Sequence, residues 1–176
     1  MYDSVRSLLE LVQEAVSPWH TVQAVSKRLS KAGFQPLDLG EKWQLESGKS
    51  YYVEAFDSTV LAFTIGCNGY TEANSLRIAA SHTDFPGLRI KPQASVIKDG
   101  YGVLNIESYG GLILASWQDR PLSIAGKITL KGQDAFHPQV RLVDFAKPLL
   151  TIPELAIHMN RKVNEGVALK KQKEML

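Results

Sequence analysis

One stretch near the middle of this 176-residue chain carries residue types suited to metal chemistry. It reads LRIAASHTDFPG, so that His82 is followed two positions later by Asp84 and then by a Pro86-Gly87 turn. A histidine that binds a metal through one ring nitrogen commonly donates its other N–H to a carboxylate. A bare His-x-Asp triplet is more often a loop histidine beside a turn-forming aspartate, so the surrounding elements decide between the two interpretations.

The residues before His82 predict the element that positions it. Leu76 to Ser81 is short and almost wholly apolar apart from Arg77, which is typical of a strand covered on both faces. We therefore expect a buried strand that delivers His82 at its carboxyl end. Open α/β sheets bind ligands in the crevice at those ends.

The preceding residues predict two helices and a hairpin. Apolar residues recur at helical spacing over residues 4–16, and again from Thr21 to Ala32, where Gly33 supplies a stop. The runs SYYVEAF and TVLAFTIG are rich in β-branched and aromatic residues, and the Asp57-Ser58 turn between them predicts a β-hairpin. The segment from Cys67 to Asn74 is expected to be a polar loop.

The sequence pattern changes from mixed helix and strand to mainly strand after Pro92. The segments YGVLNIE, LSIAGKITL and QVRLVDF are strand-like and are joined by turn residues. A helix is expected only late, starting at Pro153 and running through LAIHMNRKV. The sequence thus predicts an α/β unit over residues 1–92 and a β-rich unit over residues 93–176.

Composition narrows the classes of function. The formal charge of +2 gives no general attraction to nucleic acid or anionic lipid, and a substrate has to be inferred from a site. The single cysteine excludes an internal disulfide framework, and no apolar run reaches the roughly 20 residues of a membrane span. A cytoplasmic protein is the expectation. No GxSxG, HExxH, CxxC or glycine-rich phosphate loop is present, which removes serine hydrolases from consideration.

Longer motifs show a resemblance to a known family. SPWHTV, AGF and EKW occur in that order near the start, followed by LRIAASHTDFPGLRIKP. ESYGGLILASWQDRPLSIAGKI and LLTIPELAIHMNRKVNEG come later. Together they resemble the M18 family of zinc aminopeptidases, whose best-known members are aspartyl aminopeptidases, and the resemblance runs nearly end to end.

The resemblance implies a site and a fold. His82 corresponds to a ligand of one of two zinc ions, and Asp84 to the catalytic-site carboxylate that orients it. The bridging aspartate, the paired glutamates and the last histidine of the family fall in segments beyond position 176, so we expect a partial chain that is inactive alone. The implied fold is the N-terminal part of a zinc-peptidase α/β sandwich domain, residues 1–92, and the start of a β-rich inserted oligomerisation domain, residues 93–176.

The resemblance also implies partners. His158 matches a histidine thought to bind the substrate carbonyl oxygen in a neighbouring subunit, although a lone helical histidine usually has no chemical role. Peptides with an N-terminal Asp or Glu are the implied substrates, and a homo-oligomer the implied assembly. Phe85 departs from many members of the family, and the turn Tyr109 to Leu112 departs from eukaryotic members. These departures indicate a bacterial branch and weaken the acidic preference. A non-catalytic oligomerisation or regulatory module derived from the peptidase fold is the alternative.

Overall fold

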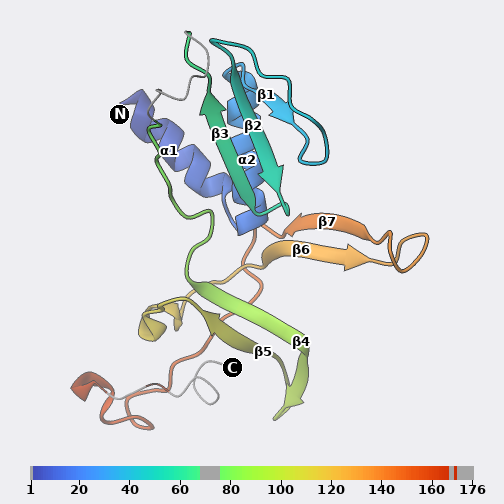
Figure 1. Ribbon diagram of the computed structural model, residues 1–176. Coiled ribbons are helices and arrows are strands. Elements are labelled where there is room, and N and C mark those ends of the chain that lie inside the picture. Colours follow the sequence, from blue (N-terminus) through green and yellow to red (C-terminus); the bar gives the residue numbers. More distant parts are fainter. Residues whose placement is uncertain (1, 68–75, 167–168, 170–176) are drawn as a thin grey trace. The chain divides into compact units, whose positions relative to one another are not determined.

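The computed structural model describes residues 2–67, 76–166 and 169 (Figure 1). Contacts divide the chain into two compact units. The first comprises Met1–Asp84 and Ala125–Asp144, and the second comprises Phe85–Ile124 and Phe145–Leu176. Each unit has its own architecture.

Two helices open the first unit, as the apolar spacing predicts. They are α1 (Asp3–Glu14) and α2 (Pro18–Lys31). Ser17 caps α2 by accepting a hydrogen bond from the backbone N–H of His20, and Pro18 occupies the first turn, where its missing N–H costs nothing. Arg28 of α2 donates to both carboxylate oxygens of Glu14, at 2.8 and 3.2 Å, and so links the two helices.

A three-stranded sheet packs beside these helices, in the order β1-β2-β3. β1 (Gln35–Leu37) is parallel to β2 (Ser50–Ala55), and β2 is antiparallel to β3 (Thr59–Thr64). The expected hairpin is confirmed. The core of this unit contains four apolar residues that are at most 5% exposed: Val22, Ala24, Tyr51 and Val53.

A second hairpin completes the first unit, although its residues come from far along the chain. It consists of β6 (Ala125–Leu130) and β7 (Gln139–Asp144), which pair in antiparallel register. Lys127 lies 5.4 Å from the centre of the Trp19 ring and 3.5 Å from Oδ2 of Asp57. These contacts join the hairpin to α2 and to the β2–β3 turn.

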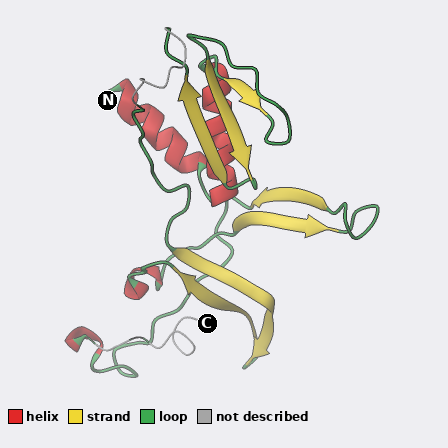
Figure 2. Ribbon diagram, in the orientation of Figure 1, coloured by secondary structure: helices red, strands yellow, loops and turns green. Residues whose placement is uncertain are grey.

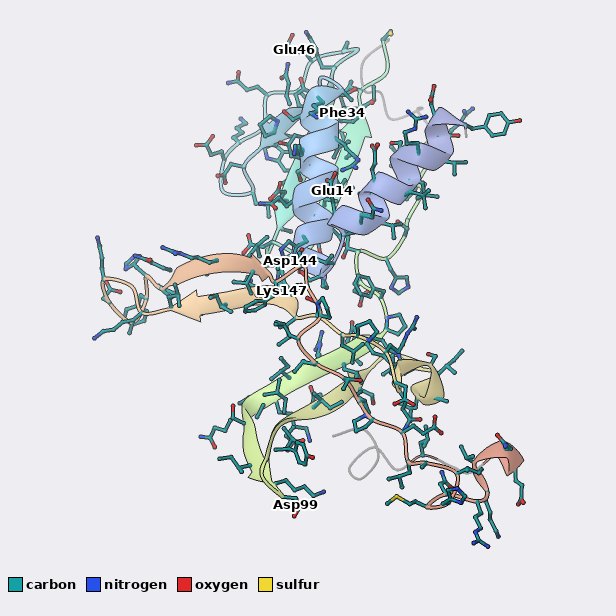
Figure 3. All side chains as sticks on the ribbon, turned by 180° about the vertical axis from the view of Figure 1, so that it is seen from behind. Glu14, Phe34, Glu46, Asp99, Asp144 and Lys147 are labelled. Atoms are coloured by element: carbon teal, nitrogen blue, oxygen red, sulfur yellow. The ribbon has the colours of Figure 1, made fainter. Side chains whose placement is uncertain are left out.

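The second unit is built on a long β-ribbon. β4 (Gly87–Lys98) pairs with β5 (Tyr101–Tyr109), and the register shifts between Ile90 and Ser95. Asp99 lies at the tip of this hairpin (Figure 3), where it and the following Gly100 both have positive φ, as tight hairpin turns require. Two short 3-10 helices follow the ribbon: η1 (Leu114–Trp117) and η2 (Val163–Glu165). Within the described residues, no helix has the length and apolar character needed to cross a membrane.

The strand expected over residues 76–81 is absent. Figure 2 draws this segment as loop, and Leu76 and Ile78 are 79% and 83% exposed. A strand requires a neighbouring backbone with which to share hydrogen bonds. No described residue supplies one here, so the prediction of a buried strand ending at His82 is wrong for this structure.

The helix expected from Pro153 through Val163 is also absent. Ile152 accepts a hydrogen bond from the N–H of Asp119, and the N–H of Glu154 donates to the side chain of the same aspartate. These bonds tie residues 152–154 to Asp119 outside any helix. Leu155 and Met159 are 50% and 72% exposed, so the described residues give a helix no apolar surface to pack against.

The units do not coincide with the predicted ranges 1–92 and 93–176. The first boundary falls between Asp84 and Phe85, and residues 125–144 return to the first unit. The three strand-like segments beyond Pro92 do form strands, as expected. The assignment of a catalytic and an inserted domain remains a prediction.

Candidate metal centre

His82 and Asp84 are in direct contact at the end of the first unit. Nδ1 of His82 lies 3.0 Å from Oδ1 of Asp84. An ionised carboxylate can only accept hydrogen bonds, so in this contact the imidazole donates from Nδ1 and keeps the lone pair of its ring on Nε2. That tautomer leaves Nε2 able to bind a metal.

The imidazole of His82 is open to solvent, whereas the carboxylate of Asp84 is mostly covered. The His82 side chain is 90% exposed and the Asp84 side chain 27% exposed. Between them, the hydroxyl of Thr83 donates a 2.8 Å hydrogen bond to the backbone carbonyl of Ser58, just before β3. This bond tethers the loop to the sheet, and the pair is therefore presented from a fixed point of the first unit.

The residues present fit one ligand position for zinc. An imidazole whose Nδ1–H is bonded to a carboxylate matches the donor chemistry that zinc takes from histidine. However, zinc takes about four ligands. Across the described part of the chain, no group of three or more His, Cys, Asp and Glu side chains could hold a metal ion. His82 and Asp84 can thus supply a first ligand and its orienting group, but not a complete site.

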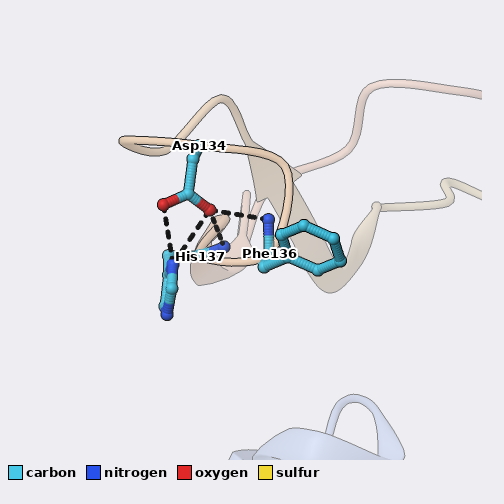
Figure 4. Close-up of polar contacts among 3 residues, drawn as sticks. All are labelled: Asp134, Phe136 and His137. Carbon is cyan, nitrogen blue, oxygen red and sulfur yellow. Dashed lines mark hydrogen bonds and ion pairs between the residues drawn. The ribbon is translucent and has the colours of Figure 1, made fainter.

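A second pair of the same kind lies in the β6–β7 turn (Figure 4). Both carboxylate oxygens of Asp134 lie within 2.9 Å of Nδ1 of His137, and Oδ1 also accepts hydrogen bonds from the N–H groups of Phe136 and His137. This pair could not be expected from the sequence, because an Asp-x-x-His spacing in a polar turn carries no specific signal.

The contacts around Asp134 favour its charged form. Its pKa is lowered, first by the hydrogen bond with the His137 ring and then by the backbone N–H of Phe136. Because the printed bonds of the Asp134 carboxylate all lie within its own turn, they are sufficient to explain the pair as one that stabilises the turn. It provides a natural control for His82 and Asp84.

His158 lies in the second unit, in a turn over residues 157–159 and not in the expected helix. Its side chain is exposed. The substrate-binding role that the resemblance implies for His158 stays a prediction. His158 and His82 belong to different units.

Comparison with known proteins identifies the family to which this chain belongs. The model of the family described as "Aminopeptidase I zinc metalloprotease (M18)" matches residues 11–176. A probable M18 family aminopeptidase 2 of Clostridium novyi is 43% identical over 170 residues, which cover 96% of this chain and 39% of that protein. A probable M18 family aminopeptidase 2 of Azotobacter vinelandii is 39% identical, with similar coverage.

Solved structures also match this chain. Ape4, from a cryo-EM structure of its complex with Nbr1, matches with a TM-score of 0.88 and 35% identity over 94% of this chain and 32% of that one. The M18 aminopeptidase of Thermotoga maritima, at 20% identity, matches in fold with a TM-score of 0.72 over 90% of this chain and 34% of that one.

These matches identify the chain as a member of the M18 family of aminopeptidases, a family of zinc metalloproteases. The identity extends over nearly the whole chain, and the mixed helices and sheets match M18 structures. The chain spans about two fifths of the length of the curated relatives that it matches. The activity, substrates and partners of this chain are therefore proposed and not shown.

Proposed function

We propose that this chain supplies the first metal ligand of a zinc-dependent aminopeptidase that removes N-terminal residues from peptides. The observation that carries this proposal is the contact between Nδ1 of His82 and Asp84 in a chain of the M18 family. The side chain of His82 is 90% exposed, so Nε2 is free to meet an ion.

In this proposal each residue has a distinct role. His82 ligates zinc through Nε2, and Asp84 fixes the tautomer and orientation of the ring and makes it a better donor. Thr83 holds the loop against Ser58. Zinc bound at such a site supplies polarisation of the scissile carbonyl and activation of the attacking water.

The remaining ligands of two zinc ions belong, in this proposal, to polypeptide that has no counterpart in the chain. One histidine with one orienting carboxylate cannot retain two ions that each take about four ligands. The 176 residues alone are expected to lack peptidase activity. The same reasoning makes His82 a weak zinc ligand until the other donors are present.

Substrate preference and assembly are further parts of the proposal. Peptides with N-terminal Asp or Glu are the first class to assay. A homo-oligomer is proposed because one solved relative, mApe1 of S. cerevisiae, is described as a dodecamer and is 25% identical over 89% of this chain and 36% of that one. His158 is proposed to bind the substrate carbonyl oxygen across such an interface. A cytoplasmic location completes the proposal.

A non-catalytic module is the second candidate function. It is favoured by the absence of any cluster of three or more potential ligands in the described residues. A module of this kind would keep the family's fold and oligomerise without binding zinc. The two candidates differ in one measurable property, which is the zinc content of a chain supplied with the missing segments.

The test uses a chimera in which the part of the C. novyi relative beyond its match to this chain is fused after Leu176. We expect the chimera to bind two zinc ions per subunit by elemental analysis and to hydrolyse aspartyl, glutamyl or leucyl amides. The 176-residue chain should do neither. His82→Ala should remove much of the metal from the chimera, whereas His137→Ala, which alters the other histidine–carboxylate pair, should leave it in place. Two zinc ions retained in the His82→Ala chimera would refute the assignment.

A further inference from the structure

The turn between β2 and β3 holds an aromatic residue in a conformation that aromatic residues rarely adopt (Figure 1). Phe56 and Asp57 have φ angles of 54° and 59°, and the N–H of Ser58 donates to the carbonyl of Ala55. Positive φ at both central positions is typical of a type I′ turn, which favours Asn, Asp and Gly. Among the described residues, Phe56 is the only aromatic residue with positive φ. Its backbone is therefore strained.

Contacts from two distant segments hold this turn in place. Nζ of Lys127, in β6, lies 3.5 Å from Oδ2 of Asp57. The hydroxyl of Thr83 donates a 2.8 Å hydrogen bond to the carbonyl of Ser58. All of these residues belong to the first unit. Strained conformations persist where the surrounding structure fixes them, and they cluster at functional sites, so the strain at Phe56 favours a functional role for the turn.

The turn lies beside the candidate metal centre. Thr83, which is bonded to Ser58, is flanked in the chain by His82 and Asp84. Phe56 precedes Ser58 by two residues, so their Cα atoms are within roughly 8 Å of each other. Phe56 is 89% exposed and the side chain of His82 is 90% exposed. A peptide a few residues long, at about 3.3 Å per extended residue, is long enough to reach both side chains.

We propose that Phe56 contacts the peptide substrate on the carboxyl side of the scissile bond and favours an apolar residue there. The inference rests on the proposed function and adds a preference to it. An aminopeptidase has to enclose the N-terminal residue, whereas the rest of the peptide extends away from the metal. An open ring such as that of Phe56 suits the second part, because an apolar side chain that packs on it removes apolar surface of both from water.

A second exposed phenylalanine provides a matched control. Phe136 lies in the β6–β7 turn and is 90% exposed, but it is not among the residues with positive φ. Its N–H donates to Asp134 within its own turn. The two residues thus share their type and exposure and differ in backbone strain. Only Phe56 has a neighbour, Ser58, that is bonded to the loop of His82.

The selectivity of the chimera for the second residue of its substrate is the first test. The ratio of kcat/KM for aspartyl-phenylalanine to that for aspartyl-glycine should fall about tenfold in Phe56→Asn, because the apolar contact is lost. Phe56→Tyr keeps the ring and should retain the ratio. Phe136→Asn should retain it as well. An unchanged ratio in Phe56→Asn, or an equal fall in Phe56→Asn and Phe136→Asn, would overturn the proposal.

Thermal denaturation of the chain alone tests the strain without any substrate. Phe56→Asn should raise the melting temperature by about 2 °C, because asparagine tolerates positive φ. Little packing is lost, since Phe56 is 89% exposed. Phe136→Asn has no such strain to relieve and should not raise the melting temperature. A lower melting temperature in Phe56→Asn would show that the ring stabilises the fold, and would contradict a role reserved for substrate.

A chimera that carries 4-fluorophenylalanine only at position 56 provides a measurement that needs no zinc. In the metal-free chimera, the fluorine resonance should shift when aspartyl-phenylalanine is added and should not shift with aspartyl-glycine. This response in a chimera that binds no zinc and hydrolyses no substrate would refute the proposed function, yet would leave the contact between Phe56 and the peptide standing.

Three further results would overturn the inference. Equal shifts of the fluorine resonance with the two peptides would exclude a preference for an apolar second residue. A resonance that responds to neither peptide, and that does not change between H2O and D2O, would place the ring against the added segment. A change in Phe56→Asn that is confined to the preference for the N-terminal residue would assign the ring to the other side of the scissile bond.

Discussion

Asp84 orients His82 across only one intervening residue, with 3.0 Å between Oδ1 of the carboxylate and Nδ1 of the ring. The intervening Thr83 points its hydroxyl back to Ser58. In the proposed metal site these three consecutive residues would have separate roles, with His82 as ligand, Thr83 as anchor and Asp84 as the orienting group. We expect the bond between Thr83 and Ser58 to survive a change at Asp84, because it joins the Thr83 side chain to the backbone of Ser58.

The first prediction concerns this carboxylate. In the chimera, Asp84→Asn should weaken zinc binding about 10–100-fold, because a neutral amide orients and polarises the imidazole less than a carboxylate does. Zinc affinity is measured by competition with a chelator. The control is Asp134→Asn, which makes the same change in the other histidine–carboxylate pair and should have no effect on the affinity.

Local patterns predicted the local elements of the first unit. The helical spacing before Gly33 and the two β-rich runs around Asp57 located α1, α2, β2 and β3 with small errors at their ends. The contact between His82 and Asp84 was also predictable, because a two-residue separation constrains it almost by itself. These features depend on few residues beyond their own segment.

Features that depend on distant partners were not predictable in the same way. Residues 76–81 have the composition of a buried strand, but a strand forms only where a ladder partner is present. The helix expected after Pro153 would likewise need an apolar surface to bury Leu155 and Met159. The return of β6 and β7 to the first unit rests on Lys127 and Trp19, whose contact has no sequence signature.

The second prediction concerns His158. If it completes the active site of a neighbouring subunit, a His158→Ala chimera and a His82→Ala chimera should each be inactive alone. The two chimeras are mixed, dissociated and reassembled. If each active site is shared by two subunits, half of the pairs are hybrids and one of the two sites in each hybrid is intact, so the mixture should recover roughly a quarter of the wild-type activity. An inactive mixture, in which native mass spectrometry detects hybrids, would contradict the contribution across the interface.

The third prediction concerns the charge of Asp134. His137→Ala should raise the pKa of Asp134 toward its ordinary value, since the ring hydrogen bond is the main cause of its lowering. A carboxyl ¹³C NMR titration measures this directly. The control is Glu14, whose pKa is lowered by its hydrogen bond with Arg28 and should not move. An unchanged titration of Asp134 would contradict the prediction.

The sign of the associated pH dependence follows from this direction. Because the folded pKa of Asp134 is below its unfolded value, the stabilising contribution is fully present above the unfolded pKa, roughly pH 4. It is lost as the pH falls through the folded pKa. The wild-type chain and the His137→Ala variant should therefore differ in stability at neutral pH and converge in acid.

The last prediction concerns Ser26, on the face of α2 that packs into the core of the first unit. Its side chain is 6% exposed, and its hydroxyl has no hydrogen-bond partner. Ser26→Ala should stabilise the chain by about 1 kcal/mol, because it removes a buried unpaired hydroxyl and improves helix propensity. Ser30→Ala, at an exposed position of the same helix, reports the propensity gain alone. Thermal denaturation of both variants separates the two effects, and equal shifts would mean that the buried hydroxyl carries no penalty.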